Sequence, residues 1–229
     1  MTIDTTAVAE YKKPRKTSSP NAETTTSAAT RGGCLDNSNT DLTAIAPYSH
    51  VGQTVATHPT FIWFVPDSES FPLEFHLDEY VGDGQVKTIY RQTLSSKPGI
   101  MSLSLPNDLP GLTVGQKYLW KVVMRCTRYN SVVVMAEMEI VAPTPEFKTT
   151  FNNTSGTSML VDFYATNGLW YDALAMASKT DFRQMELQNQ LIQELAAIET
   201  SSDSKPVQQQ GQKLIEISDF LKASQSSKK

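Results

Sequence analysis

The chain has 229 residues, 39% hydrophobic and 19% charged, enough for one domain of ordinary size with appendages or for two small domains. Its net charge of -4 argues against a nucleic-acid-binding protein, which needs a basic face for the phosphates. No apolar run approaches the roughly 20 residues of a membrane-spanning helix. The first residues lack the apolar core of a signal peptide, which leaves open a cytosolic protein or an exported one whose signal is not in this chain.

Residues 1–41 carry scattered Thr, Ser, Ala, Asn and Pro with no apolar periodicity. This composition predicts a mostly disordered arm. Its basic group, Lys12, Lys13, Arg15 and Lys16, is typical of a solvated linker, with contact to an anionic surface as the alternative.

Residues 42–145 show the alternation of short strands. Segment 59–66 is bracketed by prolines and apolar on both faces, as expected of a strand covered on both sides. Leu73, Phe75 and Leu77 alternate with polar residues, which predicts a half-exposed strand. About seven such strands, separated by turns at 81–85, 96–99 and 128–131, indicate a β-sandwich.

The sandwich is organised around the segment 112–126. Gly115 closes a turn, after which Tyr118 and Trp120 begin a strand whose alternate residues face one side. A tyrosine at this place is typical of the penultimate strand of immunoglobulin-like sandwiches, where its hydroxyl bonds back to the preceding connection. The prediction is an immunoglobulin- or fibronectin-III-like antiparallel sandwich with Tyr118, Trp120 and Trp63 as structural residues.

After residue 145 the period becomes that of helices, so the fold class is α+β. A helix from about Ser158 ends near Gly168, a second follows, and a third runs to about Thr200. The pair around Gly168 has the pattern of half a tetratricopeptide unit, which cannot bury its own apolar face. We therefore expect residues 146–200 to dock on the sandwich, and residues 201–229 to form a linker with a short terminal helix or tail.

Side chains that could carry chemistry are scattered. No spacing unites His50, His58 and His76, so the sequence predicts no metal site and no cofactor. A carboxylate pair of glycosidase type is a weaker alternative to a merely solvated acidic face; the acids concerned are Asp67, Glu69, Glu74, Asp78 and Glu79. No phosphate loop, dinucleotide fingerprint or GxSxG motif occurs.

Trp170 and Tyr171 are adjacent, so on a helix they point about 100° apart. One can pack on the sheet while the other lies near the surface. Both are therefore candidate binding residues, for a partner protein or a sugar ring, with burial of both as the other interpretation.

Cys34 and Cys126 are too few for a thiolate metal site. In the cytosol they would be two unrelated thiols. In an oxidising compartment they suit a disulfide that ties the arm to the end of the central strand. That bond would close a loop of about 90 residues, worth roughly 4 kcal/mol in the chain-entropy model.

Several segments together resemble the domain-of-unknown-function 928 family of cyanobacteria: RGGC (31–34), LTAIAP (42–47), GQTVATHPTFIWFVPDSE (52–69), SKPGIMSLSLP (96–106), LTVGQKYLWKVVMRC (112–126) and NGLWYDAL (167–174). The similarity spans about residues 31–178. It implies a periplasmic or extracellular protein, since members usually carry a secretion signal. The family has no established activity, cofactor or catalytic residues.

Three functions stay open. We favour an exported, non-enzymatic module in which the helical appendage or a free sheet edge receives a protein partner. The alternatives are a carbohydrate-binding sandwich with exposed aromatic residues and a hydrolase built on paired carboxylates. Fold alone decides none of them.

Overall fold

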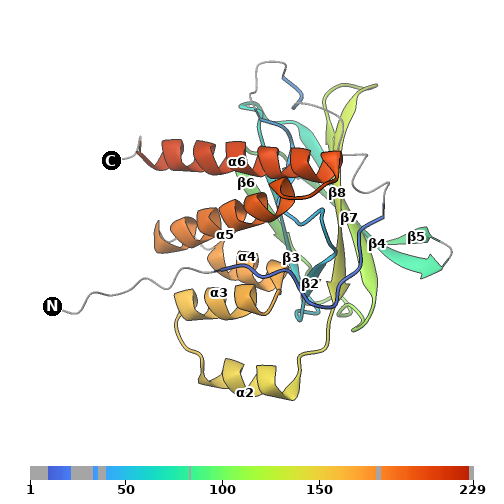
Figure 1. Ribbon diagram of the computed structural model, residues 1–229. Helices are drawn as coiled ribbons and strands as arrows, with labels where there is room; N and C mark the ends of the chain where they lie inside the picture. Colours follow the sequence, from blue (N-terminus) through green and yellow to red (C-terminus); the bar gives the residue numbers. More distant parts are fainter. Residues whose placement is uncertain (1–9, 22–32, 36–39, 83, 179–181, 227–229) are drawn as a thin grey trace.

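The computed structural model describes residues 10–21, 33–35, 40–82, 84–178 and 182–226. Within them, two β-sheets and a set of helices form an α+β architecture (Figure 1). One sheet has the order β1-β3-β6 and the other the order β2-β8-β7-β4-β5. The strands are β1 (Thr43–Ala44), β2 (Gly52–Thr54), β3 (Thr60–Val65), β4 (Pro72–Gly82), β5 (Gln85–Ser95), β6 (Gly99–Ser104), β7 (Lys117–Arg125) and β8 (Ser131–Ile140).

The core between the sheets is built from alternate residues of β3, β4 and β7. The ring of Phe61 lies 4.9 Å from Phe75 and 5.6 Å from Trp120, measured between centroids. Trp63 stacks on Phe75 at 6.2 Å. Tyr118, Val122 and Met124 of β7 are also buried, as the alternation along the sequence of β7 predicted.

The helices cover the other side of β3, so this strand is enclosed on both faces as its sequence predicted (Figure 1). Phe64 of β3 meets Phe220 edge to face at 5.3 Å. The helices are α2 (Pro145–Asn153), α3 (Thr157–Thr166), α4 (Trp170–Ala177), α5 (Phe182–Thr200) and α6 (Lys205–Ser226).

The last helix is longer than predicted. In place of a linker and a short tail, α6 has 22 residues and makes extensive contact with α5. Val207, Leu214 and Ile217 are buried on one stripe. Gln210, on the same stripe, is also buried and donates from its amide to the carbonyl of Ala44 at 2.8 Å. Because its partner lies 166 residues away, this polar residue could not be recognised as part of the buried face.

Residues 10–21 of the predicted disordered arm lie along the body of the protein (Figure 1). Tyr11 is buried, edge-on to Trp170 at 4.9 Å. The amide of Lys12 donates to Ala165, and the amide of Val51 donates to Ser18. One aromatic anchor and a row of backbone hydrogen bonds offset the entropic cost of ordering this segment, although its composition is that of a loop. The remainder of residues 1–32 lies outside the described residues.

Segment 52–54 forms strand β2, which pairs in parallel with β8, from Gly52↔Met138 to Thr54↔Ile140. Its three residues are short and largely polar, so no alternation signalled it. The ring of Tyr171 explains why residue 52 is a glycine, because a Cβ at this position would lie 2.8 Å from that ring.

Candidate functional site

Trp170 and Tyr171, the predicted binding residues, are both buried, with 0% and 2% of their surface exposed. The hypothesis that one of them lies at the surface and anchors a partner protein or a sugar ring is therefore wrong, and the other interpretation, burial of both, describes the structure. The indole Nε1 of Trp170 donates to the carbonyl of Ile45 at 2.9 Å, which ties α4 to the segment after β1. Tyr11 covers its ring. Both side chains are buried because the sheets, the arm and α5 enclose α4.

Tyr171 lies in a buried chain of hydrogen bonds. Its hydroxyl accepts from the indole Nε1 of Trp120 at 2.9 Å and donates to the carbonyl of Glu137 at 3.1 Å. Burial raises the pKa of this phenol. The chain joins α4 to β7 and β8, so Tyr171 connects the helices to the sandwich.

Cys34 and Cys126 form the predicted disulfide, with 4.9 Å between their Cα atoms. Asp67, considered above as a possible catalytic acid, supports it. The buried carboxylate of Asp67 accepts from the amides of Cys34 at 3.0 Å and Leu35 at 2.7 Å. A Cβ at Gly33 would clash with this carboxylate, so a larger residue there would have to displace it. These contacts fix the end of the arm beside β7.

Tyr118 and Gly168 occupy two tight connections. The hydroxyl of Tyr118 accepts from the amide of Thr113 at 2.9 Å, across the turn before β7. Gly168 has a φ of +76°, and a Cβ there would lie 2.9 Å from Pro14. Tyr118 therefore holds the turn before β7, and Gly168 allows the arm to pack closely against the α3–α4 connection.

The three histidines lie in separate environments. His50 is buried, with Nε2 2.7 Å from the hydroxyl of Tyr11, and burial lowers its pKa to about 3. His58 donates from Nε2 to the carbonyl of Leu109 at 2.9 Å if that nitrogen carries the proton. His76 pairs with Glu74. In the described part of the chain no three His, Cys, Asp or Glu side chains gather as a metal site requires.

Two acidic residues of β4, Glu74 and Asp78, each pair with a cation. Glu74 pairs with Arg125 at 2.7 Å, and this hydrogen-bonded contact lowers the pKa of Glu74. Asp78 is buried and pairs with Lys121 at 2.6 Å. The structure thus uses these carboxylates to hold neighbouring strands together.

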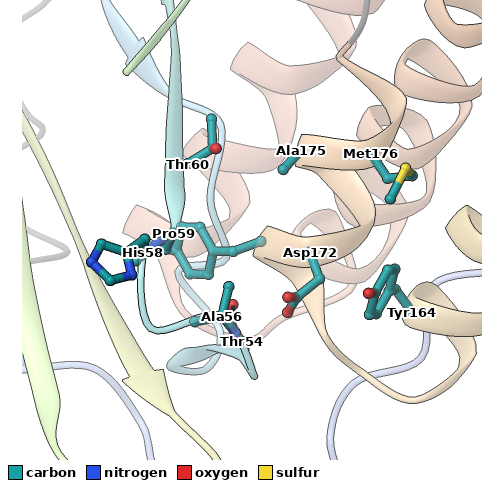
Figure 2. Close-up of a pocket in the computed structure, with 10 residues that line it drawn as sticks. Thr54, Ala56, His58, Pro59, Thr60, Tyr164, Asp172, Ala175 and Met176 are labelled. Atoms are coloured by element: carbon teal, nitrogen blue, oxygen red, sulfur yellow. Dashed lines mark hydrogen bonds between the residues drawn. The ribbon is translucent and has the colours of Figure 1, made fainter. Parts of the chain in front are cut away.

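A hollow of about 240 Å³ opens between α3, α4 and the connection from β2 to β3 (Figure 2). Asp172, in the first turn of α4, lies in it between Thr54 and Tyr164. Its Oδ2 accepts from the amide of Val55 at 3.1 Å. Burial raises the pKa of Asp172 to about 6, although hydrogen bonds from Thr54 and Val55 act in the opposite direction. Asp172 is the one carboxylate among the described lining residues.

The second candidate feature is the edge formed by β5. This strand pairs with β4 on one side, and no other described strand pairs with it on the other. Residues 85–89 are all exposed. In Figure 1 the hairpin of β4 and β5 projects from the side of the molecule opposite the helices.

In a comparison with protein families, the model described as Domain of Unknown Function (DUF928) matches residues 26–214. This span covers most of the chain. The chain belongs to the DUF928 family. None of the curated proteins compared with the chain matches it. The family resemblance of the sequence motifs is thereby confirmed.

In this DUF928 chain, the hollow beside Asp172 was missed from sequence, whereas a free sheet edge was expected without its strand being identified. Asp172 lies in an apolar segment, LWYDAL. An isolated carboxylate in such a segment only weakly indicates that the residue is buried. Its partner Val55 is 117 residues away. Which strand lies at the edge of the sheet depends on the sheet order, which local alternation does not encode. Among the described helices, none combines the length and apolar character that a membrane crossing needs.

Proposed function

We propose that this protein is a non-enzymatic interaction module that receives an extended segment of a partner protein along the free edge of β5. The observation that carries the proposal is the edge itself. It is 11 residues long, pairs with β4 alone among the described strands, and projects from the body (Figure 1). An open edge presents unpaired backbone N–H and C=O groups, which an added strand can satisfy.

The two halves of β5 offer different contacts. From Tyr90 onward, residues alternate between half-buried and exposed, as in a regular half-covered strand. Such a stretch supplies the backbone ladder for an added strand. Nearer the hairpin tip, Val81, Val86 and Ile89 are exposed to 56%, 39% and 41%, and these apolar side chains can supply contact area.

The edge also has features that limit uncontrolled pairing. The register between β4 and β5 shifts so that Leu77 pairs with Tyr90 and Asp78 with Thr88, which leaves Ile89 in a bulge. Lys87 and Arg91 add two positive charges to the strand. Bulges and charges oppose edge-to-edge aggregation, so a partner strand must match this edge specifically.

The alternatives have less support. A carbohydrate-binding role depended on an exposed Trp170 or Tyr171, and both are buried. A hydrolase depended on converging carboxylates, whereas Asp67, Glu74 and Asp78 hold separate structural partners. Neither alternative is favoured by a particular observation.

We extend the proposal to the finer fold and the compartment. The hydrogen bond from Thr113 to Tyr118 supports an immunoglobulin-like sandwich. The α3–α4 pair around Gly168, with small Ala165 and Ala173 buried at the crossing, supports a tetratricopeptide-like unit. The Cys34–Cys126 disulfide supports a periplasmic or extracellular location, where such bonds persist.

The test compares capture of partners from an envelope extract by wild type, Ile89→Lys and Val114→Lys. Val114 is an apolar residue of similar exposure, 50%, on a different connection, so its variant controls for added charge. We expect Ile89→Lys to lose a discrete partner by at least about tenfold, while Val114→Lys retains it. Retention by Ile89→Lys, or equal loss by both folded variants, would contradict the proposal.

A further inference from the structure

The hollow beside Asp172 has an unusual combination of groups for so small a space. Besides the Asp172 carboxylate, its lining includes the ring of Tyr164, the thioether of Met176 and the imidazole of His58 (Figure 2). The ring of Tyr171 lines it as well. None of the described residues that line it is a lysine or an arginine. Asp172 and the two tyrosine rings are therefore its electron-rich groups, and His58, whose Nε2 is hydrogen-bonded to the carbonyl of Leu109, is the one histidine among the described lining residues.

Asp172 has hydrogen-bond donors but, among the described residues, no cation partner. The hydrogen bonds from Thr54 and from the 55–56 backbone do not compensate its burial, because its pKa remains raised to about 6. A ligand with a positive charge would supply the missing counter-ion. An anionic ligand would meet repulsion from the same carboxylate.

The aromatic rings select among cations. Tyrosine faces attract ammonium groups, more strongly where water is excluded. Among the described lining residues a divalent metal would find one carboxylate, which is too few ligands. The volume of about 240 Å³ lies below the roughly 300–1,000 Å³ of sites for drug-sized ligands, so it suits a head group of a few heavy atoms.

We propose that this hollow binds a small organic ammonium group, with the Asp172 carboxylate as its counter-ion and the Tyr164 ring against its alkyl substituents. The site is formed by α3, α4 and the β2–β3 connection, apart from the β5 edge. It therefore does not depend on the proposed function of that edge.

Calorimetric titration of the full chain with three probes tests the proposal. Choline and ethylammonium represent quaternary and primary ammonium groups, and 3,3-dimethyl-1-butanol is the uncharged shape analogue of choline. We expect at least one of the two ammonium probes to bind. If choline binds, the neutral alcohol should bind at least about tenfold more weakly than choline. Binding of ethylammonium alone would identify a primary amine as the ligand class.

Variants locate the binding. Asp172→Asn keeps the size and the acceptor for Val55 but removes the charge, and we expect it to weaken the ammonium probe at least about tenfold. Should this variant not fold, Tyr164→Leu removes the ring but keeps an apolar side chain at a position that is 9% exposed, and it should weaken binding as well. Lack of binding by both ammonium probes at millimolar concentration, equal binding of choline and the alcohol, or undiminished binding by a folded variant would overturn the proposal.

Discussion

Tyr171→Phe tests whether α4 and the sandwich form one cooperative unit. The substitution removes one hydroxyl and leaves the ring, so packing changes little. It leaves the Nε1 of Trp120 without its acceptor, in a residue that is 0% exposed. It also removes the hydrogen bond to the carbonyl of Glu137.

The expected loss follows from these two contacts. An orphaned buried donor costs about 1–3 kcal/mol, and the loss of one ordinary hydrogen bond costs about 1 kcal/mol. The free energy of unfolding should therefore fall by about 2–4 kcal/mol. For a chain of this size, that corresponds to a fall in melting temperature of roughly 5–15 °C.

The assay is urea unfolding followed by tryptophan fluorescence and by far-ultraviolet circular dichroism. Tyr129→Phe is the control, because Tyr129 is 92% exposed and should change stability by less than about 0.5 kcal/mol. Both signals should shift together in Tyr171→Phe. An unchanged midpoint, or helices that unfold before the sheets, would refute the reasoning.

Three further predictions concern the covalent link, a turn and pH. Replacing Cys34 and Cys126 by serine should cost about 4–5 kcal/mol, since the bond joins residues 92 apart; equal denaturation midpoints would exclude a stabilising link. Tyr118→Phe should cost about 1–3 kcal/mol by orphaning the amide of Thr113, and an unchanged melting temperature would remove that role. Burial raises the pKa of Glu199 to about 7 from 4.5, so its contribution favours folding below about pH 4.5 and is lost as pH rises to about 7. The stability advantage of wild type over Glu199→Gln should accordingly shrink by about 3 kcal/mol between these pH values, and a constant difference would contradict the raised pKa.

Strands β4 and β7 were predictable because apolar and polar residues alternate along β4 and alternate residues of β7 face one side. Phe75 and Trp120 could be assigned to the core from their own neighbours in sequence, and the apolar segment 60–65 from its two apolar faces. The disulfide was predictable because the chain has just two cysteines. These signals are local, so one sequence suffices to detect them.

The remaining features depend on contacts between distant segments. Tyr11 is ordered by His50 and Trp170, and nothing in its own surroundings distinguishes it from a residue in a loop. Trp170 and Tyr171 are both buried because the arm and the sheets enclose α4 from different sides. Helical periodicity can identify one apolar face, but it cannot show that other elements pack against a second side of the same helix.

The most direct test of the interaction role is photo-crosslinking from β5 in cells that contain the natural partners. Benzoylphenylalanine would replace Ile89 or Thr93 on β5, and Tyr129 on an exposed turn as the control. The account predicts that both β5 positions form adducts with the same protein, through one extended segment of it, and that position 129 does not. Adducts with that protein from position 129 alone, or none from either β5 position, would contradict it.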